Sequence, residues 1–257
     1  MGLLEATERP SPLASHLEDR MQDLNWTLAH YTFVANVTAL AAGCDIAHSP
    51  GMSVASCHAM PKLGLAFVGS SSDLLATYAT FLADPGSEVS LLVSEEQRPV
   101  VQGAFEVDEV VPKVQMLYRG DPTNLNAGTA AELVDTDFAV ARSLVLAEGM
   151  IYERFSDVPF EQGPAFGIWE RRKLVAVGTT TLALPGLVQI GNVVTREAYR
   201  RQGLAKAVVS ALLLRHLAQG DGVFVIIDSA NGAARALFNS LDFVAERAMY
   251  SMQCVLR

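Results

Sequence analysis

The sequence predicts a mixed α/β protein built from two halves. Short runs of β-branched residues alternate with segments of helical periodicity along most of the chain. The most turn-rich stretch lies at 120–128. The charge balance changes at the same place, because residues 1–124 hold 15 acidic and 6 basic side chains whereas residues 125–257 hold 13 of each. We therefore expect two domains, 1–124 and 125–257.

The first half begins with a predicted helix over 12–42, where apolar residues recur at three- and four-residue steps. Two strands are expected over 53–69, on either side of Pro61. The remaining predicted elements of this half are a helix over 70–81, a strand over 88–93, a short helix that starts at Ser94, and a strand over 110–118 broken near its start by Pro112.

The second half shows the clearest alternation of strands and helices. The strand at 223–227 consists only of apolar residues, so we expect it to be central and buried on both faces. The other predicted elements are a short strand over 130–133, a helix over 136–146, a hairpin of strands 165–169 and 174–181, a strand over 187–194, a helix over 203–218, a helix over 234–241 and closing strands over 243–255.

Composition excludes several classes of protein. The three cysteines, Cys44, Cys57 and Cys254, are odd in number and form no CxxC pair, which argues against a disulfide framework and against a metal site. A net charge of −9 disfavours nucleic acid as a partner. The apolar runs are too short to cross a membrane, and the N-terminus lacks the pattern of a signal peptide, so we expect a cytoplasmic protein.

The run from Ile190 to Lys206 carries the functional argument. A β-branched strand leads into a polar turn that opens a long helix, with Arg200-x-x-Gly203-x-Ala205 at the junction. The first turn of a helix leaves about four N–H groups unpaired beside a partial positive charge, so it stabilises an anion. Small residues let the anion approach the backbone, and a pyrophosphate fits this arrangement. No GxxxxGK[ST] or GxGxxG motif is present, which disfavours P-loop and Rossmann sites.

This turn resembles the (R/Q)-x-x-G-x-(G/A) turn of the GNAT acyltransferase superfamily, and the resemblance covers roughly residues 130–257. A second family pattern is similar to Asn231-x-x-Ala234-x-x-Leu237-Phe238. The resemblance implies a mixed central sheet with flanking helices, acetyl-CoA as co-substrate, and a carbonyl donor at the Val194 N–H. The implied cofactor-binding residues are Val193, Val194 and Thr195 along the pantetheine, Arg200, Arg201, Gln202, Gly203, Leu204, Ala205 and Lys206 around the pyrophosphate, and Asn231 and Phe238 near the pantetheine arm.

Two departures from the family leave the catalytic acid and base unassigned. Phe238 stands where many members have a proton-donating tyrosine, and packing is its better interpretation. The strand at 187–195 has no carboxylate where many members carry a glutamate base, so Gln189 and Asn192 are expected only to position water or substrate. The remaining candidates are the acids Glu153, Asp157 and Glu161, then Tyr199 and Tyr250, whereas His216 is expected to be structural.

The first half resembles the degenerate second GNAT-like half of glycine acyltransferase-like proteins. It lacks the (R/Q)-x-x-G-x-(G/A) turn, so it should not bind coenzyme A, and it is expected to complete the acceptor pocket. Its acidic residues, Glu95, Glu96, Glu106 and Glu109 among them, would favour a cationic acceptor.

The resemblance implies transfer of an acetyl or short acyl group to the primary amine of a small molecule, by a monomer or homodimer. Two alternatives stay open: acetylation of protein lysines or N-termini, and a regulatory module that binds acyl-CoA without turnover.

Overall fold

The computed structural model describes residues 46–49, 52–57, 63–82, 84–148, 160, 162–184 and 186–257. They form two compact units. Unit 1 comprises the described residues up to Lys113 together with Ala248–Arg257, and unit 2 is Val114–Arg247. The helix predicted over 12–42 lies outside the described residues.

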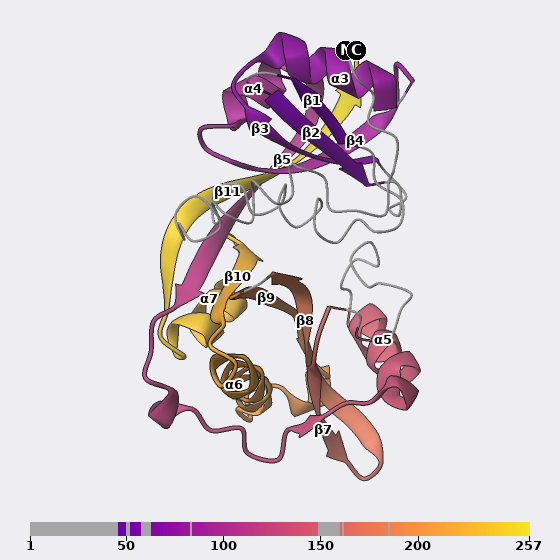
Figure 1. The fold of residues 1–257 in the computed structure, drawn as a ribbon. Coiled ribbons are helices and arrows are strands. Elements are labelled where there is room, and N and C mark those ends of the chain that lie inside the picture. The colour runs from indigo at the N-terminus through magenta and orange to yellow at the C-terminus, as the bar shows by residue number, and fades with distance from the viewer. Residues whose placement is uncertain are drawn as a thin grey trace. The chain divides into compact units, whose positions relative to one another are not determined.

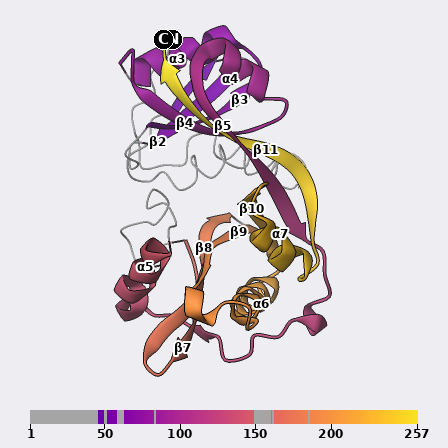
Figure 2. The same ribbon diagram turned by 180° about the vertical axis from the view of Figure 1, so that it is seen from behind.

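Unit 1 is a sheet covered on one face by two helices, α3 (Ser72–Leu82) and α4 (Arg98–Ala104), which lie side by side (Figures 1 and 2). Its strands follow the order β1-β2-β3-β4-β11-β5. β3 and β4 are parallel, whereas β1–β2, β2–β3 and β4–β11 are antiparallel pairs. The strands are β1 (Ile46–Ser49), β2 (Met52–Cys57), β3 (Leu63–Gly69), β4 (Glu88–Ser94), β5 (Phe105–Tyr118) and β11 (Phe243–Leu256).

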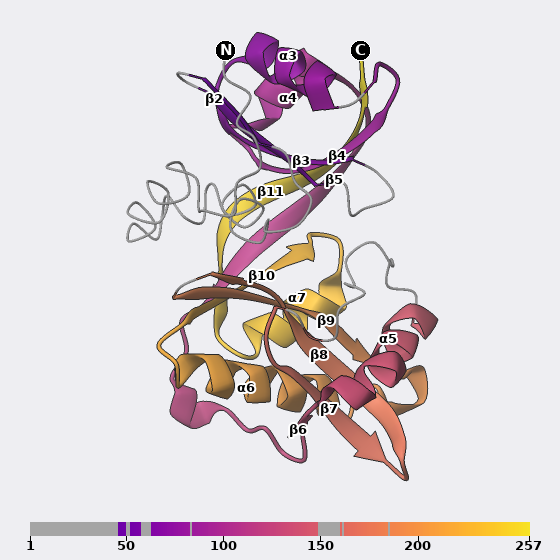
Figure 3. The same cartoon turned by 45° about the vertical axis from the view of Figure 1, so that its right-hand side comes forward.

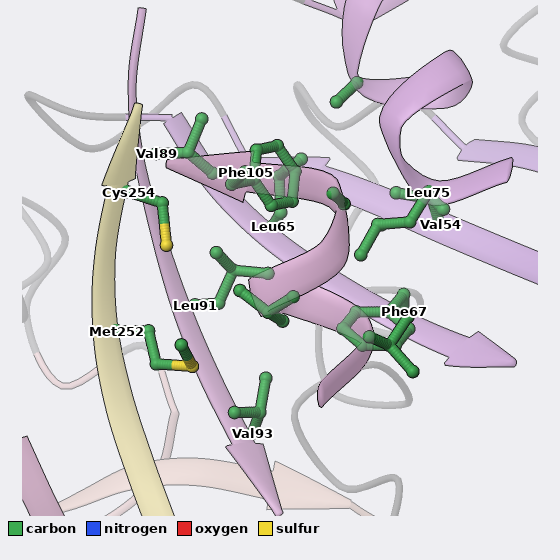
Figure 4. Close-up of a cluster of buried hydrophobic side chains, with 14 of the residues drawn as sticks. Val54, Leu65, Phe67, Leu75, Val89, Leu91, Val93, Phe105, Met252 and Cys254 are labelled. Carbon is green, nitrogen blue, oxygen red and sulfur yellow. The ribbon is translucent and has the colours of Figure 1, made fainter. Parts of the chain in front are cut away.

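The C-terminal strand β11 supplies part of the core of unit 1. Met252 and Cys254 point into the same buried cluster as Leu65 and Leu91, beneath the helices (Figure 4). Burial, with a smaller contribution from the charge of Asp108, raises the pKa of the Cys254 thiol to about 11. Cys254 is thus a buried, protonated thiol.

Unit 2 has strands with helices on both faces. β10 lies between β5 and β9, and the order continues β9-β8-β7-β6. Helices α6 and α7 pack on one face and α5 on the other, so that α5 and α6 flank the strands from opposite sides (Figure 3). The elements are β6 (Ala131–Glu132), α5 (Phe138–Ala147), β7 (Ala165–Glu170), β8 (Lys173–Leu184), β9 (Leu187–Thr195), α6 (Leu204–Leu217), β10 (Gly222–Asp228) and α7 (Gly232–Asn239), with 3₁₀ turns at Pro122–Asn124, Asp135–Asp137 and Glu197–Tyr199.

The elements predicted from the sequence occur in the expected order among the described residues, but the sequence analysis missed strand β1. The expected central strand is β10, whose Val223, Phe224 and Val225 are buried. None of the described helices has the length and apolarity that crossing a bilayer requires.

Two predicted element boundaries were wrong. Helix α4 begins at Arg98 rather than at Ser94, because Ser94 still belongs to β4 and Pro99 occupies the first helical turn, where its missing N–H is tolerated. Strand β5 begins at Phe105 and runs through Pro112. Proline lacks the N–H that a strand ladder uses, so a strand break was expected there, but the backbone of β5 stays extended through this position.

The first part of the chain passes from one compact unit to the other between residues 113 and 114, whereas the sequence predicted a domain boundary between residues 124 and 125. The reason lies in β5, whose last residues Val114, Met116 and Tyr118 pack in the core of unit 2. The strand therefore leaves unit 1 before the turn-rich stretch is reached. The same happens in reverse at β11, which begins in unit 2 and ends in unit 1.

We predict that Met252→Ala lowers the free energy of unfolding by about 2–5 kcal/mol, because this fully buried side chain would leave a cavity in unit 1. Val244→Ala is the matched control, since Val244 lies on the same strand but is 49% exposed. It should change stability by less than about 0.5 kcal/mol. Urea unfolding of the whole chain measures both, and equal effects would contradict a core role for the C-terminal strand.

Candidate functional site

The site begins where two parallel strands stop pairing. β9 and β10 are paired at only three positions, Leu187 to Gln189 against Gly222 to Phe224. Both strands continue, β9 to Thr195 and β10 to Asp228. The edge of β9 that faces β10 therefore has unpaired positions beyond Gln189. We call this stretch the unit 2 gap.

A β-bulge in β9 lies beside the unit 2 gap. Val194 pairs with Val177 of β8 and Gly191 pairs with Thr179, so β9 holds one extra residue between them. Asn192 has a positive φ of 49°, and its Nδ2 donates to Thr179 Oγ1 at 3.0 Å. The bulge changes which way the following backbone groups point.

The hydrogen bonds around the bulge show which amides face the unit 2 gap. Arg196 N donates to Val175 O at 2.9 Å. Because an antiparallel ladder alternates, the Val194 amide also points toward β8, whereas the amides of Val193 and Thr195 point toward β10. The Thr195 carbonyl agrees, since it accepts from Arg200 Nε at 3.1 Å. The ladder thus favours Val193 and Thr195, rather than Val194, as donors into the gap.

The turn after β9 presents a series of free backbone N–H groups. Arg201 and Gly203 have positive φ values of 65° and 79°, and Gly203 is the N-cap of α6. The first helical bond runs from Ala207 N to Gly203 O, and no N–H of residues 201–206 has an acceptor among the described residues. Successive N–H groups at a helix N-terminus form a concavity that binds anions.

The space around this turn and the strand beside it suits a phosphate-bearing ligand. A Cβ added at Gly203 would meet no atom within 4 Å, so the turn is open on that side. Nearby, the Thr195 hydroxyl is buried and has no hydrogen-bond partner in the part of the chain that the structure describes. The residues present therefore fit a ligand that combines a pyrophosphate with a hydrogen-bonding arm.

The basic side chains of the turn are largely committed to the protein itself. Arg196 Nε donates to Leu174 O at 2.8 Å, and Lys206 Nζ donates to Ser240 O at 3.0 Å. Arg200 bonds Glu148 and the Thr195 carbonyl. Exposed Arg201 has no partner among the described residues, so it is the cation of the turn that remains free to meet an anion.

Asn231 and Phe238 lie in different surroundings. Asn231 is exposed just beyond β10 and caps α7, where its Oδ1 accepts from Ala234 N at 2.9 Å. Its Nδ2 has no partner among the described residues. Phe238 is 3% exposed, and its ring packs edge-on against Phe243 with 5.1 Å between centroids. Phe238 therefore belongs to the core, as its packing interpretation predicted.

Unit 1 contains a matching gap that is closed. β3 and β4 are parallel and, like β9 and β10, are paired at only three positions, Leu63 to Leu65 against Val89 to Leu91. Beyond them Gln97, the N-cap of α4, donates from Nε2 to Phe67 O at 2.8 Å and accepts from Ser94 N at 3.0 Å. Its carboxamide thus bonds the ends of both strands. Asn231 occupies the same N-cap position in unit 2 without reaching β9.

The weaker catalytic candidates do not gather at the unit 2 gap. His216 is buried behind β8, where Nε2 lies 2.8 Å from Thr180 Oγ1 and Nδ1 lies 3.2 Å from Asp221 Oδ2. Tyr199 packs beside the core cluster of Ile168. Tyr250 belongs to unit 1, where its ring lies 5.0 Å from the Arg98 guanidinium. Glu153, Asp157 and Glu161 lie outside the described residues.

Sequence reasoning missed three features that shape these sites. The Gly191-Asn192 pair is a turn signal inside a strand, so a bulge there could have been predicted. Gln97 directly precedes a helix, but only the structure shows what its side chain bonds. Glu148 carried no signal, because its partner Arg200 lies 52 residues further along the chain.

Known proteins share this architecture. Residues 165–252 match the family model described as FR47-like protein. A GNAT-family protein from Novosphingobium aromaticivorans is 23% identical over 82% of this chain and 91% of its own, with a TM-score of 0.65. The chain has the GNAT fold.

Further structures extend the likeness to the fold as a whole. A GCN5-related N-acetyltransferase from Kribbella flavida has a TM-score of 0.63 at 14% identity, covering 88% of this chain and 95% of its own. A tandem GNAT protein from the clavulanic acid biosynthesis pathway has a TM-score of 0.58 at 13% identity, covering 83% of this chain and 82% of its own. No curated protein sequence matches the chain. The GNAT likeness therefore includes both units, and the two tandem halves expected from the sequence are confirmed at the level of the fold.

We predict that His216→Leu lowers the free energy of unfolding by about 1–3 kcal/mol, because Thr180 and Asp221 would lose a buried partner. Arg215→Leu alters the neighbouring, exposed residue and should cost less than about 0.5 kcal/mol. Chemical denaturation followed by circular dichroism compares the two variants. An unchanged midpoint for His216→Leu would rule out the structural role.

Proposed function

We propose that this protein is an acyltransferase that moves an acetyl or short acyl group from acyl-CoA to the primary amine of a small molecule. One observation carries the proposal: a gap between two parallel strands leads directly into a turn with free backbone N–H groups. An extended arm that ends in a pyrophosphate matches both features at once. Coenzyme A has that shape.

The turn would bind the pyrophosphate mainly through its backbone. The N–H groups of residues 201–206 carry no full charge, but they can donate several hydrogen bonds to the ligand. The dipole of α6 adds a partial positive charge at the same place. Hydrogen bonds from such donors to an ionised acceptor are stronger than neutral ones. Arg201 supplies the full positive charge. Lys206, expected from the sequence to add charge here, instead bonds the C-terminal end of α7.

The unit 2 gap would hold the pantetheine arm as an added strand. The amide of Thr195 would donate to it, and the free Nδ2 of Asn231 would contact it from the β10 side. Such pairing satisfies backbone groups that otherwise need water. Its geometry also sets the position of the thioester relative to β9.

Acyl-CoA would bring a thioester carbonyl and a thiolate leaving group, and the protein would align and polarise the carbonyl. The Val193 N–H, next to the bulge at Asn192, is our candidate donor to the carbonyl oxygen. Removing one preorganised donor of this kind typically costs about 10²–10³-fold in rate. Alignment of a neutral amine with the thioester would supply the rest of the rate acceleration.

β9 offers no acidic or basic side chain for the proton transfers of the reaction. Its side chains near the gap, Gln189 and Asn192, are neutral, and Phe238 is buried and has no proton to give. This favours one rival function from another class, a regulatory module that binds acyl-CoA without turnover. Acetylation of protein lysines or N-termini is the rival within the same class.

The acidity of unit 1 supports a cationic acceptor. Glu106 and Glu109 are exposed on β5, and Glu95 and Glu96 are exposed in the turn before α4. Surface carboxylates raise the local concentration of cations. Polyamines and amino-acid amines are therefore the first acceptors to test.

We expect Gly203→Glu to weaken coenzyme A binding by at least about tenfold, because it strains a left-handed residue and adds a negative charge beside the pyrophosphate. Gly186→Glu is the control, since Gly186 also has a positive φ, of 73°, and open space around it, in the turn between β8 and β9. Calorimetric titration with coenzyme A measures both. Normal affinity in Gly203→Glu would remove the pyrophosphate assignment.

Titration with acetyl-CoA, followed by thiol release with a panel of amines, tests the function itself. We expect one site per chain, because Gln97 closes the gap of unit 1, and release that depends on the amine. Binding without amine-dependent release would favour the regulatory module. A protein that binds no acetyl-CoA at all would overturn the proposal.

A further inference from the structure

We infer that Glu148 is a positioning residue for the pyrophosphate-binding turn and that it acts through Arg200. The inference rests on the proposed function, since it concerns how the same turn is held ready. It also assigns different roles to the two neighbouring arginines, Arg200 and Arg201.

One guanidinium joins three parts of unit 2. Arg200 Nη2 donates to Glu148 Oε2 at 2.6 Å, and Arg200 Nε donates to Thr195 O at 3.1 Å. Glu148 is the C-cap of α5, Thr195 ends β9, and Arg200 opens the turn. Because the guanidinium is a rigid planar fork, these two bonds fix the end of β9 relative to the start of the turn.

The position of Glu148 is unfavourable for a carboxylate considered alone. A helix C-terminus carries partial negative charge, so an acid at the C-cap of α5 is repelled by the helix dipole. The Glu148 side chain is only 15% exposed, which adds a desolvation cost. The bond to Arg200 offsets both costs. A carboxylate held in such a place therefore indicates a role in geometry rather than in net stability.

The pairing also decides which arginine meets the phosphates. The charge of Arg200 is already neutralised by Glu148, whereas Arg201 is exposed and free of partners among the described residues. Arg201 and Gly203 have left-handed backbone conformations that orient the N–H groups of the turn. They closely follow Arg200, which Glu148 holds in place. Arg200 thus orders the turn, and Arg201 supplies its charge.

The test is calorimetric titration of coenzyme A at several salt concentrations. Glu148→Ala and Arg200→Ala should each raise Kd about tenfold, the effect of losing one charge-assisted hydrogen bond. The double variant should be no worse than either single variant, because both remove the same contact. In the double variant, which removes both charges of the pair, the dependence of Kd on salt should stay unchanged, whereas it should weaken in Arg201→Ala, which removes the charge that salt screens. Glu148→Gln should bind nearly normally, since its amide oxygen still accepts from Arg200.

Control variants keep the test decisive. Arg215→Ala breaks an exposed ion pair with Glu132 near the other end of α6 and should leave Kd unchanged. Thermal unfolding shows whether each variant is folded. If an alanine variant fails to fold, Glu148→Asp and Arg200→Lys serve instead and should show the same loss, because neither side chain can span the bridge.

Three outcomes would count against the inference. Normal Kd in Glu148→Ala or Glu148→Asp would overturn it. A weakened salt dependence in the double variant, equal to that of Arg201→Ala, would also overturn it by making Arg200 a direct phosphate ligand. Failure of the unaltered protein to bind coenzyme A would overturn the proposed function, and this inference with it.

Discussion

Backbone N–H and C=O groups inside a protein must find partners, and this requirement organises unit 2. β9 and β10 stop pairing after Gln189 and Phe224, while both strands continue. The bulge at Asn192 turns the amides of Val193 and Thr195 toward the opening, and the left-handed turn at Arg201 and Gly203 continues the row of donors into α6. These local features together form one row of hydrogen-bond donors, and this row is the basis of the proposed acyl-CoA site.

The two units exchange strand segments, and this explains why the compact units do not coincide with the two halves of the sequence. β5 leaves unit 1 to pack Met116 and Tyr118 in unit 2, and β11 leaves unit 2 to pack Met252 and Cys254 in unit 1. Each unit is therefore completed by residues from the other half of the chain. Contacts so distant in sequence close long loops, which slows folding more than it changes stability. Neither unit has a complete core if the chain is cut in the middle.

The parts of the site that could be predicted are those coded locally. The turn from Arg200 to Ala205 was found because a strand, a glycine and a helix start follow one another in the sequence. The bonds of its side chains could not be found in this way, because Arg200 meets Glu148 and Lys206 meets Ser240 across 52 and 34 residues. Element boundaries failed where the tertiary context decides: β5 continues through Pro112, although a proline usually interrupts a strand.

Gln97 makes the two units differ, because its side chain closes the gap between β3 and β4 in unit 1. Its carboxamide, the same chemical group that a pantetheine arm offers, bonds the ends of β3 and β4. A group tethered a few residues away has an effective concentration of millimolar order or higher, so a diffusing amide competes poorly with it. A protein that doubles a ligand-binding fold also doubles its demand for ligand. In unit 1 a single side chain makes hydrogen bonds of the kind that such a ligand would make, so unit 1 can diverge in surface and charge while its framework persists.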